Sequence, residues 1–287
     1  MCQIRTNAQV DPTHTLILRK KYEAAMYRRF RALKGSVTRY LTGPWMLAVN
    51  RDLAPLPAIP KRAFVFTERP ARVREFVSWL GEEMDRGILE VTARTGPTIV
   101  GHAEWQNVYI SSSYQRGILD ARRKLGEPLD IEKSGGQFAN PFNQPFHADR
   151  VGLLFARNFE ELKGVTNAMG QKMARTLAQG MAEGRGPRQI AGFLARDIDK
   201  IGLQRARTIA RTEIVRAHAE ANLNVFEQYG VTGITTLAEI LTAGDDRVCP
   251  ICWGAEADTS SKPLTIQEAR GLIPFHPNCR CTYMPKL

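Results

Sequence analysis

The stretch VGLLFARNFEELKGVTNAMGQKMARTLAQGM, residues 151–181, carries the longest regular pattern in the chain of 287 residues. Its large apolar side chains recur every three or four residues, which places them on one stripe of an α-helix. Gly164 and Gly170 interrupt the pattern at about 1 kcal/mol each relative to alanine, so the helix can kink or split there. The stripe consists of Val151, Phe155, Phe159, Leu162, Val165, Met169, Met173, Leu177 and Met181.

Three segments before this stretch show the same period. Residues 14–41 form one amphipathic helix, a second is expected to begin at Pro70, and a third surrounds residues 105–118. Their apolar faces are expected to be buried. The first face comprises Leu18, Tyr22, Met26, Phe30, Leu33, Val37 and Leu41, and the second comprises Val73, Phe76, Val77, Leu80, Met84 and Ile88.

Two helices are expected after the long stretch, with a break near residue 200. Pro187 opens a short helix that runs to Ile198, and the next helix covers roughly residues 203–229. The second of these has a buried row and an outer face on which opposite charges are spaced for pairing. The row is Ala210, Ile214, Ala217, Ala221 and Val225, and the outer face carries Arg207, Arg211, Glu213, Arg216, Glu220 and Glu227.

Composition divides the chain into four ranges. Residues 1–50 are a basic N-terminal helical arm, 51–69 a proline-rich linker, 70–230 a helical body and 231–287 a small module that holds most of the cysteines. The last range is richer in β-branched residues and glycine, and much of it is irregular. The predicted fold class is mainly α, with long amphipathic helices and a small C-terminal α+β module.

Positive charge is concentrated at the start of the chain. Residues 1–80 hold 15 Lys and Arg against 5 Asp and Glu, a net charge of +10 out of +11 for the whole chain. Such an arm can contact nucleic acid through its phosphates without sequence preference. A solvated helix face and a docking face for an acidic protein are the alternatives. The candidate nucleic-acid contacts are Arg19, Lys20, Lys21, Arg28, Arg29, Arg31 and Lys34.

The sequence shows no sign of membrane insertion or secretion. No apolar run approaches the roughly 18–20 residues of a membrane span, and the first ten residues lack the apolar segment of a signal peptide. We therefore expect a cytoplasmic chain whose thiols stay reduced. In that compartment, clustered cysteines bind metal more often than they form disulfides.

Four of the five cysteines fall in the last 39 residues. Cys249 and Cys252 form a C-x-x-C pair, and His276, Cys279 and Cys281 follow after 23 intervening residues. These five donors exceed the four positions of a tetrahedral zinc site, and the pattern leaves open which four would bind. A module of about 55 residues with few large apolar side chains needs such support to fold. We predict a zinc-stapled module, with reduced buried thiols or disulfides as the alternatives.

The same cluster does not have the pattern of a catalytic zinc site. A catalytic zinc keeps one open position and a neighbouring carboxylate, whereas thiolate-rich donors here suffice to close the coordination shell. The H-x-E pattern of zinc deaminases is absent. A nuclease centred on His276 is the enzymatic alternative. We assign no catalytic residue and predict that the protein is not an enzyme.

Three ordered motifs in the last 85 residues resemble the Mu F-like minor head proteins of tailed bacteriophages, the phage head morphogenesis family. They are A-R-T-E with Arg211, Thr212 and Glu213, then D-x-x-V-C-P-x-C from Asp245, then H-P-x-C-R-C from His276. Weaker likeness extends up to about residue 100. Where relatives often carry a tryptophan on a strand before the cysteine pair, this chain has residues 237–241.

The resemblance implies a minor capsid protein that acts in head assembly near the portal. Implied partners are the portal protein, a scaffold or major capsid protein, and packaged DNA without sequence preference. The implied locations are the host cytoplasm during assembly and the interior of the virion. A role as a DNA-binding ejection protein is a further alternative.

Overall fold

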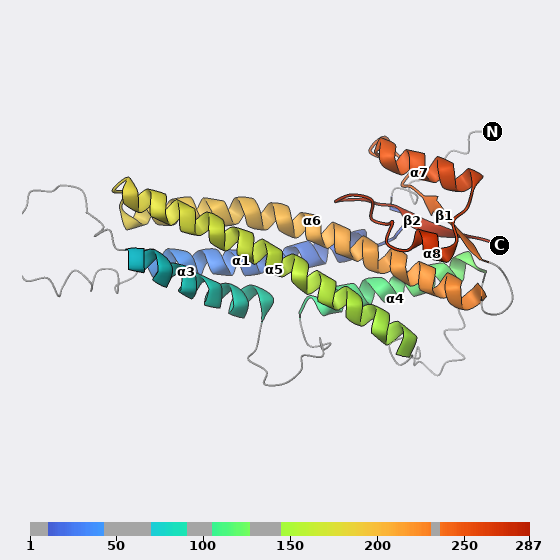
Figure 1. Cartoon of the computed structure of the whole chain (residues 1–287), viewed down its shortest axis with the longest axis horizontal. Helices are drawn as coiled ribbons and strands as arrows, with labels where there is room; N and C mark the ends of the chain where they lie inside the picture. The colour runs from blue at the N-terminus through green and yellow to red at the C-terminus, as the bar shows by residue number, and fades with distance from the viewer. Residues whose placement is uncertain (1–10, 43–69, 91–104, 127–144, 231–235) are drawn as a thin grey trace, which may run out of the picture. The chain divides into compact units, whose positions relative to one another are not determined.

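The computed structural model describes residues 11–42, 70–90, 105–126, 145–230 and 236–287. Long helices make up most of this part of the chain, and a two-stranded sheet lies near its C-terminal end (Figure 1). None of the described helices is long and apolar enough to cross a membrane. These helices and the small sheet confirm the predicted mainly α fold with a small α+β element. The expected linker at 51–69 and Cys2 lie outside the described residues.

Along the described part of the chain, five α-helices are followed by a strand, two short helices and a second strand, with a short π-helical turn after the second α-helix. They are α1 (Leu16–Thr42), α3 (Pro70–Met84), η2 (Asp85–Leu89), α4 (Asn107–Lys124), α5 (Pro145–Ala182), α6 (Pro187–Gly230), β1 (Leu237–Leu241), α7 (Pro250–Ser261), α8 (Ile266–Ala269) and β2 (Thr282–Lys286).

The predicted break between two C-terminal helices is wrong, because α6 is one continuous helix of 44 residues. Gly202, next to the expected break, faces the ring of Phe30 on α1. A Cβ built on Gly202 would lie 2.8 Å from Cγ of Phe30. This glycine therefore permits close packing of two helices and does not end one. Helix α5 likewise runs unbroken through Gly164 and Gly170.

The burial of two side chains differs from what the periodicity predicts. Val77 was expected in the core but is 38% exposed, because Phe76, one residue earlier, occupies the core position of α3. Glu213 was expected on the outer face of its helix but is only 3% exposed. All residues of the α1 stripe and of the predicted buried row of α6 are buried.

The chain divides into two compact units. One contains residues 24–96 and 159–207, and the other contains residues 1–23, 97–158 and 208–287. Helices α1, α5 and α6 each contribute residues to both units. The domain boundaries expected at residues 50, 69 and 230 fall within or beside segments outside the described ranges, so they stay predictions.

The unit that contains the cysteine-bearing module is built on the contact between α4 and α6. A Cβ on Gly117 would lie 2.5 Å from the carbonyl oxygen of His218, so only glycine allows this approach. The Ser113 hydroxyl donates to the Ile214 carbonyl at 2.6 Å, and the Asn222 amide donates to the Gly117 carbonyl at 2.7 Å.

The small sheet is joined to this helix pair through Lys124. Strands β1 and β2 are antiparallel, with Leu237 opposite Lys286 and Leu241 opposite Thr282. The buried Lys124 ammonium donates to the Tyr283 carbonyl of β2 at 2.7 Å and pairs with Asp120 of α4 at 2.6 Å. Burial lowers the pKa of Lys124 against the raising effect of Asp120.

Candidate metal centre

The first half of the cysteine cluster is held by the start of α7. Cys249 is the N-cap residue, and Pro250 occupies the first helical turn, where its fixed φ angle favours helix initiation. The Cys249 sulfur accepts the backbone N–H of Cys252 at 3.5 Å. The cap geometry thus brings the sulfurs of both cysteines to the same end of the helix.

The second half is a tight loop before β2. Asn278 has φ +69°, a left-handed conformation that asparagine adopts more readily than most residues. The Cys279 N–H donates to the His276 carbonyl at 3.1 Å, which closes the turn. Cys279 and Cys281 are both buried, at 1% and 2% exposure.

All five predicted donors converge in the structure. Nε2 of His276 lies 3.2 Å from the sulfurs of both Cys249 and Cys252, and the sulfurs of Cys252 and Cys279 are 3.9 Å apart. Cys252, Cys279 and Cys281 form a second group whose sulfurs all lie within 4.8 Å of one another. Cys252 therefore belongs to both groups.

These distances can be compared with a zinc site. With Zn–S bonds of about 2.3 Å, two thiolates of a tetrahedral site lie about 3.8 Å apart. The separation of 3.9 Å between Cys252 and Cys279 matches that value. The donors present fit a metal ion that prefers sulfur and imidazole ligands.

Hydrogen bonds lower the pKa values of two of the thiols, and burial raises that of a third. The bond from the Cys281 thiol lowers the pKa of Cys279 to about 5, and backbone N–H groups assist it. The N–H of Cys252 also lowers the pKa of Cys249. Burial and the neighbouring Cys279 raise the pKa of Cys252 to about 12. The site therefore favours a thiolate at Cys279, and a bound cation would favour the deprotonation of further thiols.

His276 is held by both ring nitrogens. Nδ1 lies 2.8 Å from the Pro277 carbonyl, while Nε2 faces the two sulfurs of the C-x-x-C pair. Burial lowers the pKa of His276, but the Pro277 carbonyl and the nearby thiolates outweigh it and raise that pKa. An Nδ1–H bond to a carbonyl is the usual way in which a protein fixes the tautomer that presents Nε2 as a metal ligand.

An ion pair connects the two halves of the cluster. Arg280, between Cys279 and Cys281, makes two bonds to Asp245 at 2.6 and 2.8 Å. Arg280 holds the pKa of Asp245 well below its usual range, and Arg247 adds to the effect. Asp245 precedes Cys249 by four residues, so this ion pair connects the segment before the C-x-x-C pair to the loop that carries Cys279 and Cys281.

The A-R-T-E segment of α6 lies beside the module. Arg211 donates to the Asn278 side chain at 3.4 Å, and Thr212 is half-buried. The buried Glu213 lies 3.6 Å from Arg157 of α5 and 3.6 Å from Arg216. Glu213 is thus an internal ion-pair residue, whereas Arg211 reaches the loop that carries His276 and Cys279.

The predicted nucleic-acid contacts of α1 fall into two groups. Arg19 is 5% exposed and is paired with Asp11 at 2.6 Å. Arg29 is paired with Glu90, and Lys34 with Asp199. The exposed members are Lys20, Lys21, Arg28 and Arg31. DNA contact through them stays a prediction.

Two networks that support the site were missed in the sequence. Arg270 bonds to Glu220, Glu227 and Asn224 of α6, which ties the segment after α8 to that helix. Thr265 and Glu268 form a capping box at the start of α8. The T-x-x-E spacing could have revealed the capping box, whereas nothing in the sequence pairs Arg270 with residues more than 40 positions earlier.

The structure thus defines a mainly helical protein with a small C-terminal module around a Cys/His cluster suited to a metal ion. Residues 171–284 match the family described as Phage Mu protein F like protein. The match includes all of α6 and the whole Cys/His cluster, and it confirms the resemblance seen in the sequence. No curated protein and no solved structure matches the chain.

Proposed function

We propose that this protein is a minor structural protein of a tailed-phage head, acting in head assembly near the portal. The family match over α6 and the module supports this role. Its partners would be the portal protein and a scaffold or major capsid protein. Assembly would take place in the host cytoplasm, with the protein then carried inside the virion.

Within this role, the C-terminal module would be folded around one structural zinc ion. Two overlapping groups of donors carry this proposal: His276 lies against Cys249 and Cys252, and Cys252 in turn lies against Cys279, so donors from two loops meet at Cys252. The four donors joined by contacts of 3.2 to 3.9 Å are Cys249, Cys252, His276 and Cys279. Cys281 would then donate a hydrogen bond to the Cys279 sulfur.

The geometry favours a structural role over nuclease activity at His276. A general base needs a ring nitrogen that can reach substrate. Here Nδ1 is at hydrogen-bond distance from a carbonyl oxygen, and Nε2 faces two sulfurs. We therefore propose that His276 is a ligand and that the protein is not an enzyme.

Metal analysis of the purified full chain tests the zinc proposal. We expect about one equivalent of zinc in the wild-type protein, and loss of that zinc in the Cys252→Ser variant. Cys2→Ser is the matched control and should keep its zinc. Less than half an equivalent in wild type, with four freely titratable C-terminal thiols, would refute the site.

Head assembly tests the wider role. Phage particles made with Cys252→Ser should contain much less of this protein than wild-type particles, as measured by quantitative mass spectrometry of purified heads. Particles made with Cys2→Ser should contain normal amounts. Equal incorporation of both variants would show that the folded module is not needed for entry into the head.

A second candidate function is DNA contact through α1 during packaging or ejection. Lys20, Lys21, Arg28 and Arg31 are its exposed basic side chains, and they supply the phosphate-neutralising charge that such contact needs. Replacing all four by Gln should weaken duplex DNA binding and reduce its salt dependence. Unchanged or salt-insensitive binding would exclude this function for α1.

A further inference from the structure

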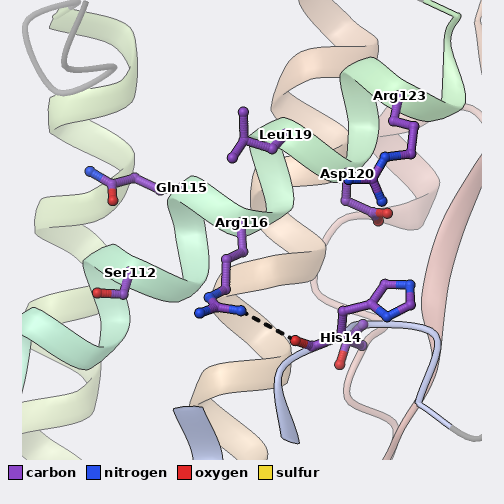
Figure 2. Close-up of a pocket in the computed structure, with 8 residues that line it drawn as sticks. His14, Ser112, Gln115, Arg116, Leu119, Asp120 and Arg123 are labelled. Carbon is purple, nitrogen blue, oxygen red and sulfur yellow. Dashed lines mark hydrogen bonds between the residues drawn. The ribbon is translucent and has the colours of Figure 1, made fainter. Parts of the chain in front are cut away.

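A cleft on α4 lies apart from the Cys/His cluster and plays no part in the roles above. Its volume is about 540 Å³, and it is bounded by one stripe of α4 and by the turn that precedes α1 (Figure 2). The stripe runs from Ser112 to Arg123, roughly 16 Å of helix at 1.5 Å per residue. Its size is that of a site for a small organic ligand.

The cleft has an excess of positive charge. Arg116 and Arg123 both line it and are exposed. Arg116 bonds to the His14 carbonyl at 3.4 Å, and within the described part of the chain neither guanidinium is paired with a carboxylate. Both therefore keep a full charge that a ligand can neutralise.

The acidic residue of the cleft does not cancel this charge. Asp120 is 8% exposed and is already paired with the buried Lys124 ammonium at 2.6 Å. His218 lies 3.5 Å from the same carboxylate, and burial lowers the pKa of His218 to about 4, so it is neutral at pH 7. With one carboxylate balanced by one lysine, the two arginines leave a net positive site.

The remaining lining suits a ligand with a phosphate group and an organic body. Ser112 and Gln115 lie on the same stripe as the arginines and offer neutral hydrogen-bond donors. The side chain of Leu119 adds an apolar surface between them. Two guanidiniums and the further donors supply more N–H and O–H groups than the two oxygens of one carboxylate can accept. A phosphate presents more oxygen atoms, in the geometry that arginine prefers.

We propose that this cleft binds the phosphate group of a nucleotide, either free or within a single nucleic-acid strand. Arg116 and Arg123, seven positions apart on α4, supply the charge that neutralises the phosphate, and Leu119 contacts the sugar or base. The site depends on neither the zinc ion nor the exposed basic face of α1.

Binding of three probes to the full-length protein tests the proposal: inorganic phosphate, adenosine 5′-monophosphate, and a thymidine strand of about 12 nucleotides. The Arg116→Gln/Arg123→Gln double variant should weaken binding of the monophosphate or the strand by at least about tenfold. Lys172→Gln/Arg175→Gln removes the same charge from exposed positions of α5 and should bind like wild type. Binding of the monophosphate alone identifies a free nucleotide, and binding of the strand alone identifies nucleic acid.

Circular dichroism and a melting curve establish that the double variant is folded. The proposal is overturned if wild type binds neither the monophosphate nor the strand, or if both double variants bind equally well. It is also overturned if polyglutamate displaces the probes as effectively as unlabelled nucleotide, because the surface would then recognise carboxylates.

Discussion

The unit formed by residues 24–96 and 159–207 and the C-terminal module at 236–287 are stabilised by different means. The first has a core of large apolar side chains from long helices, among them Phe30, Leu80, Leu162 and Met173. The module has two strands of five residues and two short helices. Much of what is buried in it is small or polar.

The buried side chains of the module show what replaces the apolar core. Ile240, Ile273 and Tyr283 are its large buried apolar groups among the described residues, beside three buried cysteines. Ion pairs such as Asp245–Arg280 connect its loops. We therefore expect one region to depend on apolar area removed from water and the other on the proposed zinc ion. On that basis we expect that each can be perturbed without the other.

The largest effect is expected from replacing Cys252, the cysteine that belongs to both groups of donors. Cys252→Ser should lose zinc and unfold the module, since structural zinc contributes apparent binding energies of about 10–16 kcal/mol in small domains. Limited proteolysis should then cut within residues 236–287 and leave residues 159–207 intact. A protease pattern identical to that of wild type would contradict a role for zinc in keeping the module folded.

The converse change should disturb only the apolar unit. Phe30→Ala removes the ring that packs on Gly202 and should cost about 3–5 kcal/mol. Denaturant unfolding, followed by hydrogen exchange, should place the loss in α1 and the first part of α6, while zinc content stays at one equivalent. Loss of zinc in this variant would show that the two regions are not independent.

A smaller effect is expected from the ion pair around the metal loops. Asp245→Asn removes the charge that pairs with Arg280, and changes of this kind weaken metal binding about 10- to 100-fold. Competition with a chromogenic chelator measures the affinity. Asp246→Asn, at the exposed neighbouring position, is the control and should match wild type.

The smallest effect is expected at the contact between α6 and the metal loop. Arg211→Ala removes one hydrogen bond of 3.4 Å at an exposed site, so the loss should stay below about 1 kcal/mol. Thermal melting with zinc present measures it. A loss of several kcal/mol would mean that Arg211 supports the module far more strongly than its exposed position suggests.

Sequence patterns predicted the helices well where apolar residues repeat over many turns. The stripe of α1 and the run of α5 are examples, because their period is long enough to outweigh single glycines. The pattern failed at Gly202, where the reason for a glycine is the ring of Phe30, 172 positions away in the chain. Contacts between distant segments leave no local signal.

The same limit applies to the candidate site. The clustering of the cysteines with His276 was predictable, because C-x-x-C and H-x-x-C-x-C spacings are local and chemically specific. Strand β1 at Leu237–Leu241 also formed where the resemblance placed a strand, without the usual tryptophan. The pairing of Asp245 with Arg280 and the burial of Glu213 could not be predicted, since both depend on how the segments meet.

Hydrogen exchange of the wild-type protein before and after zinc chelation measures whether a zinc ion keeps residues 236–287 folded. We expect chelation to remove one equivalent of zinc and to abolish protection in residues 236–287, while α5 and the first half of α6 keep their protection. Protection that is unchanged throughout the chain after complete chelation, or lost equally in both regions, would contradict this expectation.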